Sequence, residues 1–307
     1  ARSTPWFNLV AHRRIPAGAP VVYMAEDVSF PICRARSLVV QHGVWWDGEL
    51  NALELRAAEL MVRRAVRRSR GLICVDTNFA NWLRARWPGT QWDHKLHLIP
   101  NFLDARTFGP PPEVPAAARG GRVTICFPRR SEPRRGLHLM ADAAPQLLAR
   151  FPQVDIRFVV GSGNHTDALR RRLADAACPA SRCSIEVHGF DDMRSVYRES
   201  QIVTIPTVCG EGTSLAAIEA MYCGCAVVGT WVGGLADLLW HEQNALVIAP
   251  DAAQLTAACA RLVEDPLLRV RLGSRALADA PARFAIERWQ YSVGAVLEQA
   301  LGLGVAR

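Results

Sequence analysis

Short apolar runs rich in β-branched residues alternate with amphipathic stretches along most of the chain after residue 120. The apolar runs have the length of buried strands, and the stretches between them have the 3.6-residue spacing of helices. Strands that alternate with helices in this way predict a parallel sheet in an α/β domain. The expected strands are 123–127, 155–161, 184–190, 202–206, 225–230 and 245–249, and the expected helices are 137–151, 167–177, 192–200, a stretch that ends at Gly224, and 252–273.

The residues before this region show the same pattern over a shorter length. One strong amphipathic helix, 50–70, lies between apolar runs. A stretch of about 110 residues is short for a full doubly wound domain. The sequence therefore predicts two Rossmann-like domains facing a cleft, of which the first is shortened. The strands expected in the first domain are 21–24, 37–46, 71–76 and 96–100.

The boundary between the two domains is marked by composition. The segment GPPPEVPAAARGG, residues 109–121, is rich in Pro, Gly and Ala, which favours a linker. We therefore expect a first domain at 1–110, a linker at 111–120 and a second domain at 121–285. The amphipathic pattern of the last segment, 286–307, predicts a helix that crosses back to the first domain.

The composition is that of a soluble globular protein, with 50% hydrophobic and 21% charged residues. No apolar run approaches the ~18 residues of a membrane span, and the first residues lack the hydrophobic core of a signal peptide. The nine cysteines form no CxxC pair, and several lie in apolar runs. Reduced thiols in the cytoplasm are the expectation, with a metal or redox site at Cys223-Gly-Cys225 as the alternative.

A Gly-rich turn follows the expected strand 202–206. In parallel sheets ligands bind at the carboxyl ends of the strands. A helix that begins near Thr213 or Ser214 offers unsatisfied N–H groups and a partial positive charge to an anion. Gly212 lets the backbone approach a ligand closely. The segment is therefore a candidate seat for a phosphate group.

Two glutamates stand eight positions apart in this otherwise apolar segment. Glu219 could accept hydrogen bonds from both hydroxyls of a ribose, and Glu211, in the turn, could accept them from a second sugar. The segment then predicts a nucleotide-sugar site, with phosphate at the helix start. The alternative is a core helix flanked by two partly exposed glutamates.

A basic loop, FPRRSEPRRG at 127–136, follows the expected strand 123–127. It holds four arginines, whose forked guanidinium groups suit phosphate oxygens. A diphosphate leaving group would need such positive charge. The alternative is a solvated basic loop, which is the usual role of a run of charges.

Together these segments resemble family 4 retaining glycosyltransferases, the glycosyl transferases group 1, which have the GT-B fold. EGTSLAAIEAM is similar to the E-x7-E signature of that family. RRSEPRRG resembles its R-x4-K-G phosphate loop, with Arg130 and Arg135 on the two basic positions and Arg135 in place of the commoner Lys. QHG, with His42, resembles a histidine of the first domain that faces the donor sugar. The resemblance covers roughly residues 37–285, and its further matches are VVGSGN (159–164), HGF (188–190), WVGGLADLL (231–239), HEQNALVIAP (241–250) and IPNFLDARTF (99–108).

The resemblance implies transfer of a sugar from a nucleoside-diphosphate sugar, with retention of anomeric configuration, to a hydroxyl of a glycan, a lipid-linked compound or a small molecule. It implies no metal, and the sequence contains no DxD to hold one. The nucleotide sugar is a co-substrate, and no other cofactor is expected. The catalytic residues implied are His42, Arg130, Arg135 and Glu211. The donor-binding residues implied are Gly163, Gly189, Phe190, Gly212, Thr213, Ser214, Leu215 and Glu219.

The basic end of the helix 50–70 raises the question of a further partner. Related enzymes that act on lipid-linked acceptors dock through the first domain, so weak peripheral attraction to the inner face of an anionic membrane is one hypothesis. A core-packed helix with arginines placed favourably near its carboxyl end is the other. No nucleic-acid-binding module is recognisable, so nucleic acid is not an expected partner. The arginines concerned are Arg63, Arg64, Arg67, Arg68 and Arg70.

Other interpretations remain open at this point. The strand and Gly-rich loop with which the family usually begins are absent from the first twenty residues. A non-catalytic nucleotide-sugar-binding or scaffold subunit and a sugar-nucleotide epimerase would share the fold. A dehydrogenase is disfavoured because VVGSGN lacks the full GxGxxG pattern. His42 could be structural, and Trp45 and Trp46 could either floor an acceptor site or pack in the core.

Overall fold

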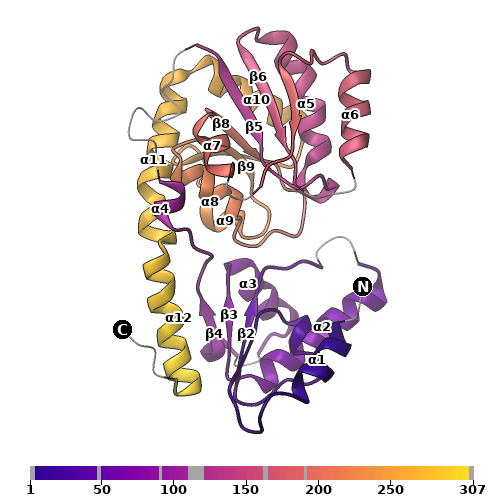
Figure 1. The fold of residues 1–307 in the computed structure, drawn as a ribbon, viewed down its shortest axis with the longest axis vertical. Coiled ribbons are helices and arrows are strands. Elements are labelled where there is room, and N and C mark those ends of the chain that lie inside the picture. The colour runs from indigo at the N-terminus through magenta and orange to yellow at the C-terminus, as the bar shows by residue number, and fades with distance from the viewer. Residues whose placement is uncertain are drawn as a thin grey trace. The chain divides into compact units, whose positions relative to one another are not determined.

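The computed structural model describes residues 4–46, 50–89, 92–109, 121–161, 165–189 and 192–303 (Figure 1). The chain forms two compact units. The first unit consists of residues 1–101, 210–213 and 287–307, and the second consists of residues 102–209 and 214–286. The predicted linker 111–120 lies outside the described residues.

The second unit is built on a parallel six-stranded sheet. Its strand order is β10-β9-β8-β5-β6-β7, so the chain first adds strands on one side of β5 and then on the other. The strands match the predicted alternation, but the expected strand 184–190 is shorter than predicted, since it ends at Glu186. The strands are β5 (Val123–Phe127), β6 (Val154–Val159), β7 (Cys183–Glu186), β8 (Ile202–Ile205), β9 (Ala226–Thr230) and β10 (Ala245–Ile248).

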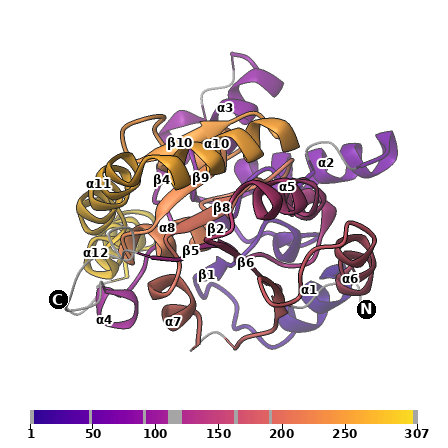
Figure 2. The same cartoon turned by 90° about the horizontal axis from the view of Figure 1, so that it is seen from above.

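Helices cover both faces of this sheet. On one face α5, α6 and α10 pack against inward-facing residues such as Ile125, Phe127 and Phe158, and α5 and α10 lie side by side (Figure 2). On the other face α7, α8, α9 and the second half of α11 bury Cys126 and Val203. The helices are α4 (Ala105–Phe108), η4 (Pro133–Arg135), α5 (Leu137–Arg150), α6 (Thr166–Asp175), α7 (Met193–Arg198), α8 (Leu215–Tyr222), α9 (Leu235–Leu238), α10 (Ala252–Glu264) and α11 (Pro266–Phe284).

The prediction of one helix over 252–273 was wrong. The structure has two helices, α10 and α11, separated by Asp265. The Asp265 side chain accepts a hydrogen bond from the backbone N–H of Leu268 at 2.9 Å. Pro266 supplies a first helical residue without an N–H. An N-cap followed by proline starts a new helix, and it outweighs the apolar periodicity that runs through the break.

The first unit contains a parallel four-stranded sheet in the order β1-β2-β3-β4. The expected strand 37–46 is confirmed only in its first half. It ends at Gln41 because the Gln41 side chain turns back onto the chain, accepting from Gly43 N at 2.8 Å and donating to Gly43 O. The elements of the first unit are α1 (Thr4–His12), β1 (Val21–Tyr23), η1 (Asp27–Ser29), β2 (Ser37–Gln41), α2 (Ala52–Arg68), β3 (Gly71–Cys74), α3 (Thr77–Arg86), η2 (Asp93–Lys95), β4 (Leu96–Leu98) and α12 (Ile286–Leu301), of which the first residue of α12 belongs to the second unit.

Both faces of the smaller sheet are also covered. One face packs against α2 and α3 around Val39, Leu72 and Phe79. The other packs against α12 around Leu38 and Ile73. Two arginines fix the end of α12, since the side chains of Arg36 and Arg70 donate to the carbonyls of Leu301 and Ala300 at 2.7 and 2.8 Å.

The nine cysteines are free, and Cys223 and Cys225 lie in the core of the second unit. Burial raises the pKa of the Cys223 thiol to about 12, so this thiol is neutral at physiological pH. No helix within the described residues combines the length and the apolar character that a membrane span requires.

Candidate functional site

The loops after β5 and β8 leave the sheet of the second unit at its point of reversal. These two strands are parallel neighbours, with Ile125 opposite Ile202. In an open parallel sheet, the crevice beside such a reversal is where ligands bind. The two loops are also joined directly, because the backbone N–H of Val208 donates to the carbonyl of Arg134 at 2.9 Å. The basic loop and the glutamate segment therefore meet at a position that favours a ligand.

Arg129 connects the basic loop to the start of α8. Its side chain is 9% exposed, and its Nη1 donates to Ser214 Oγ at 2.9 Å, while Nη2 lies 3.4 Å from Thr207 Oγ1. Ser214 is the N-cap residue of α8. The guanidinium therefore adds a full positive charge beside a helix start that already favours anions. Arg129 was not among the predicted site residues, although it is the first charged residue after the end of β5.

The other three arginines of the loop gather around Glu132. Arg134 Nε donates to Glu132 Oε2 at 2.9 Å, and Arg130 and Arg135 place a guanidinium nitrogen 3.5 and 4.0 Å from the same carboxylate. Burial tends to raise the pKa of Glu132, but the three cations lower it overall, so the carboxylate is charged. The side chain of Arg130 is 53% exposed and that of Arg135 is 13% exposed. The loop is therefore a shaped, partly enclosed array and not a freely solvated one.

Gly136 makes this array compatible with the neighbouring strand. Its φ is +79°, a left-handed conformation that disfavours any other residue. A Cβ atom at this position would lie 1.9 Å from the carbonyl oxygen of Pro206, which follows β8. Glycine is therefore required where the basic loop passes the end of β8 and enters α5.

We expect Gly136→Ala to lower the free energy of unfolding by at least about 2 kcal/mol, because it combines left-handed strain with a backbone clash. Gly121→Ala is the matched control, since Gly121 in the same unit has φ +98° but no atom within 4 Å of the added Cβ. Chemical denaturation of both variants measures the difference. Equal destabilisation would show that the contact with Pro206 is unimportant.

Glu219 lies inside α8 and already has one protein partner. It is 6% exposed, and Tyr197 Oη donates to its Oε2 at 2.7 Å. Burial raises the pKa of the Glu219 carboxyl above its ordinary value, and the hydrogen bond from Tyr197 and the charge of Arg129 oppose this only in part. The alternative of partly exposed glutamates was wrong, because Glu219 is buried. Tyr197 engages one of its two oxygens, and the binding of a ribose by this carboxylate stays a prediction.

Of the other donor-binding residues predicted for the second unit, two lie within the described residues and two lie outside them. Leu215, the first residue of α8, is 45% exposed. Gly189 lies beyond β7, and its N–H donates to Asp192 Oδ2 at 3.3 Å. Gly163 and Phe190 lie outside the described residues.

The first unit contains His42 in the turn after β2. The side chain is exposed, and its Nε2 lies 2.8 Å from the carbonyl oxygen of Met24. The two tryptophans that follow it, Trp45 and Trp46, differ in burial. Trp46 is 3% exposed and packs edge-on against Trp82 and Phe79, so the hypothesis that it floors an acceptor site was wrong. Trp45 is 38% exposed and donates from Nε1 to the buried carboxylate of Glu26.

The segment Gly210–Thr213 belongs to the first unit. Thr213 Oγ1 donates to the carbonyl of Val75, and Asn101 Nδ2 donates to the carbonyl of Thr213 at 2.9 Å. Gly212 is packed so closely that an added Cβ would lie 2.4 Å from the carbonyl oxygen of His42. Glu211 is 6% exposed. Through Gly212, the segment that contains Glu211 thus packs against the backbone of His42.

Comparison with known proteins places these segments in a family. Residues 122–265 match the family model for glycosyl transferases group 1. The chain is 33% identical over 198 residues to a phosphatidyl-myo-inositol mannosyltransferase of Mycolicibacterium smegmatis, covering 63% of this chain and 50% of the relative. It is 29% identical over 267 residues to a D-inositol 3-phosphate glycosyltransferase of Pseudarthrobacter chlorophenolicus, covering 84% of this chain and 60% of the relative. The chain thus spans about half to three-fifths of the length of these relatives.

The fold agrees with solved structures of the same kind. HepE of Anabaena, solved in complex with UDP, superposes with a TM-score of 0.77 at 19% identity, covering 96% of this chain and 82% of HepE. Sucrose-phosphate synthase of Thermosynechococcus elongatus superposes with a TM-score of 0.73 at 21% identity, covering 87% of this chain and 68% of the synthase. Each unit of this chain is a parallel α/β domain, as the GT-B fold requires. Over residues 122–265, nearly half of its length, the chain is similar to the glycosyl transferases group 1.

Proposed function

We propose that the protein is a retaining glycosyltransferase that moves a hexosyl group from a nucleoside-diphosphate sugar to an acceptor hydroxyl. The observation that carries this proposal is the cluster at the ends of β5 and β8. There Arg129 joins the basic loop to the N-cap of α8 through Ser214, and Glu219 lies one turn further along the same helix. An arginine-rich loop and a helix start thus lie beside a buried carboxylate, and this combination suits the phosphates and the ribose of a nucleoside diphosphate.

In this proposal the basic loop stabilises the leaving group. The bond between the anomeric carbon and the diphosphate oxygen breaks, and its electron pair stays on the diphosphate. Arg130 and Arg135, together with the helix start at Ser214, would stabilise the developing negative charge. The acceptor oxygen would bond to the anomeric carbon from the face that the diphosphate leaves, and the acceptor proton would pass to the departing phosphate.

The carboxylates would orient the donor. Oε1 of Glu219 would accept hydrogen bonds from the ribose diol, while Tyr197 holds Oε2 in place. Glu211 and His42 would contact the donor sugar. No step requires a metal ion, so we propose that transfer proceeds equally well with and without a chelator.

The names of the relatives suggest where to look for substrates. Two of them are named for transfer to phosphatidyl-myo-inositol or to D-inositol 3-phosphate, and HepE has been solved with UDP-glucose. The test is a screen of UDP-, GDP- and dTDP-sugars for thermal stabilisation, followed by mass spectrometry of products formed with inositol phosphate, phosphatidylinositol and simple sugar acceptors.

The products separate this function from its alternatives. Stabilisation together with an acceptor-dependent glycoside supports transfer. A changed sugar nucleotide formed without an acceptor would indicate an epimerase. Stabilisation by a nucleotide sugar without any product would indicate a binding or scaffold subunit.

The raised pKa of Glu219 predicts a pH dependence of nucleotide binding. A ribose diol donates to the ionised carboxylate, so affinity should be full at neutral pH and should fall as the pH drops through the pKa of Glu219. Because burial raises that pKa, the fall should begin at a higher pH than for an exposed glutamate. Calorimetric titration at several pH values measures it, and Glu219→Gln should flatten this component. An unchanged pH profile in the variant would rule out Glu219 as its origin.

A further inference from the structure

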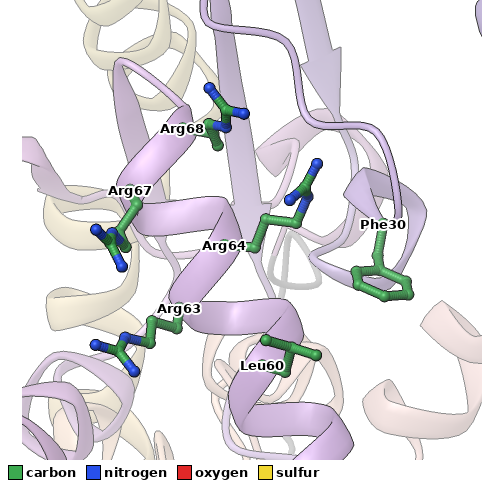
Figure 3. Close-up of a pocket in the computed structure, with 6 residues that line it drawn as sticks. All are labelled: Phe30, Leu60, Arg63, Arg64, Arg67 and Arg68. Carbon is green, nitrogen blue, oxygen red and sulfur yellow. The ribbon is translucent and has the colours of Figure 1, made fainter.

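A basic cleft in the first unit lies along α2 and outside the cluster described above. Its volume is about 580 Å³, and it lies between α2 and the chain that follows η1 (Figure 3). Its arginines repeat with the i, i+4 spacing of one helical turn, so pairs of them stack along the helix. The lining residues are Phe30, Leu60, Arg63, Arg64, Arg67 and Arg68.

In the part of the chain that the structure describes, these arginines have no acidic partner. Within the described ranges, none of the four lining arginines forms an ion pair. The nearby carboxylates are engaged elsewhere: Glu54 closes the capping box at the start of α2, Glu59 pairs with Arg86, and Asp27 accepts from the N–H of Val28 at 2.9 Å. Among the residues that the structure describes, the four arginines that line the cleft therefore have no acidic side chain to pair with.

Capping of the helix end does not account for these arginines either. Lys95 Nζ donates to the carbonyls of Val66 and Ser69, each at 3.0 Å. The carboxyl end of α2 thus already has a cation that satisfies its carbonyls. The favourable interaction with the helix dipole explains why arginines are tolerated in the last turn. It does not explain why the arginine side chains line a cleft.

Arg64 points most directly to a ligand. Its side chain extends from the side of α2 that faces Phe30, while the side chains of Arg63 and Arg67 point to the other side (Figure 3). Its Nε is buried and has no hydrogen-bond partner. A buried donor without a partner is costly, and an anion in the cleft would satisfy it. The nearby Cys33 thiol cannot supply the negative charge, because burial raises its pKa above the ordinary value and keeps it neutral. The charges of Arg64, Arg68 and Lys95 lower this pKa but do not cancel the effect of burial.

We propose that this cleft binds a phosphate group, with Arg64 and Arg68 as its main contacts. Guanidinium groups match phosphate oxygens in charge and geometry, and several of them favour a dianion. Leu60, which is 57% exposed, and Phe30 would contact the apolar part of the molecule that carries the phosphate. A soluble phosphorylated compound and a phospholipid headgroup share this chemistry.

The first experiment is a calorimetric titration of the full chain with inorganic pyrophosphate, in the presence of a saturating nucleoside diphosphate that occupies the site proposed at the ends of β5 and β8. Arg64→Gln/Arg68→Gln is expected to weaken binding at least about tenfold, because two charge-assisted contacts are lost. Arg56→Gln, on the same helix but outside the cleft, is the matched control and should bind like the wild type. Thermal stabilisation by nucleoside diphosphates should be unchanged in both variants, which separates this cleft from the donor cluster and shows that the variants are folded.

The second experiment identifies the source of the phosphate. The same three proteins are sedimented with phosphatidylcholine vesicles that either contain or lack phosphatidylinositol, at low salt. Pelleting that needs phosphatidylinositol and is lost only in the double variant supports the site with a lipid headgroup as ligand. Pyrophosphate binding lost in the double variant, without such pelleting, supports it with a soluble ligand. If all three proteins behave alike in both experiments, the cleft is not a phosphate site, whatever the outcome of the nucleotide-sugar screen.

Discussion

Alanine in place of Arg130 or Arg135 is expected to lower the rate of sugar transfer about 10²-fold or more, as for other preorganised groups that stabilise developing charge. The effect should fall on kcat, because charge on the diphosphate grows as its bond to the sugar breaks. Arg135 should be the more sensitive position, since its side chain is 13% exposed against 53% for Arg130. Steady-state kinetics with the donor found in the screen measures both variants.

Arg134→Ala tests whether such losses merely reflect disturbance of the loop. Arg134 makes the shortest contact with Glu132, at 2.9 Å, but it is not proposed to contact the diphosphate. We expect a smaller loss of turnover than in the other two variants. Near-normal turnover in both Arg130→Ala and Arg135→Ala would remove the leaving-group role, and equal losses in all three variants would make it structural.

The second large effect is expected at Glu219. Glu219→Gln keeps the shape of the side chain but replaces a charged acceptor with an amide, so the hydrogen bonds to a ribose diol weaken. Hydrogen bonds to charged groups are worth about 1.5–3 kcal/mol each, so affinity for the nucleoside diphosphate should fall tenfold or more. Tyr197→Phe removes the hydrogen bond to Oε2 and should cause a smaller loss, because the carboxylate itself remains.

Glu211 provides the contrast, because the proposal places it on the sugar. Glu211→Gln should leave binding of the nucleoside diphosphate nearly intact and should impair turnover with the full donor. Calorimetry with the diphosphate and with the nucleotide sugar, on both variants, separates the two roles. Equal losses of diphosphate affinity in Glu211→Gln and Glu219→Gln would show that Glu211 does not hold the sugar.

The parallel sheets could be predicted because each strand is a short apolar run bounded by polar residues. Two helices of the first unit could not be predicted in this way. In α1 the apolar residues Trp6 and Phe7 are exposed, so the chain shows no apolar stripe that faces a core. The start of α3 was hidden because Asp76 was included in the expected strand 71–76, whereas its side chain accepts from Phe79 N and caps the helix. Local capping decided both this start and the break at Asp265.

The candidate site could be predicted at the level of segments but not of contacts. Motif spacing indicated the basic loop and the glutamate helix, because both follow strands of one parallel sheet. Spacing alone could not indicate that Arg129, and not its neighbour Arg130, reaches Ser214. It also could not indicate that Tyr197, which lies on another helix, engages Glu219. Both contacts depend on how distant segments pack, which a linear pattern does not record.

The location of the nucleotide tests the central proposal most directly. Hydrogen exchange is measured on the full chain with and without the nucleoside diphosphate that stabilises it best. Slower exchange of amides in residues 129–136 and at the start of α8, around Ser214, is the expected result, because the phosphates would bind these backbone groups. Protection that leaves both segments unchanged and appears elsewhere, for example along α2, would contradict a donor site at the ends of β5 and β8.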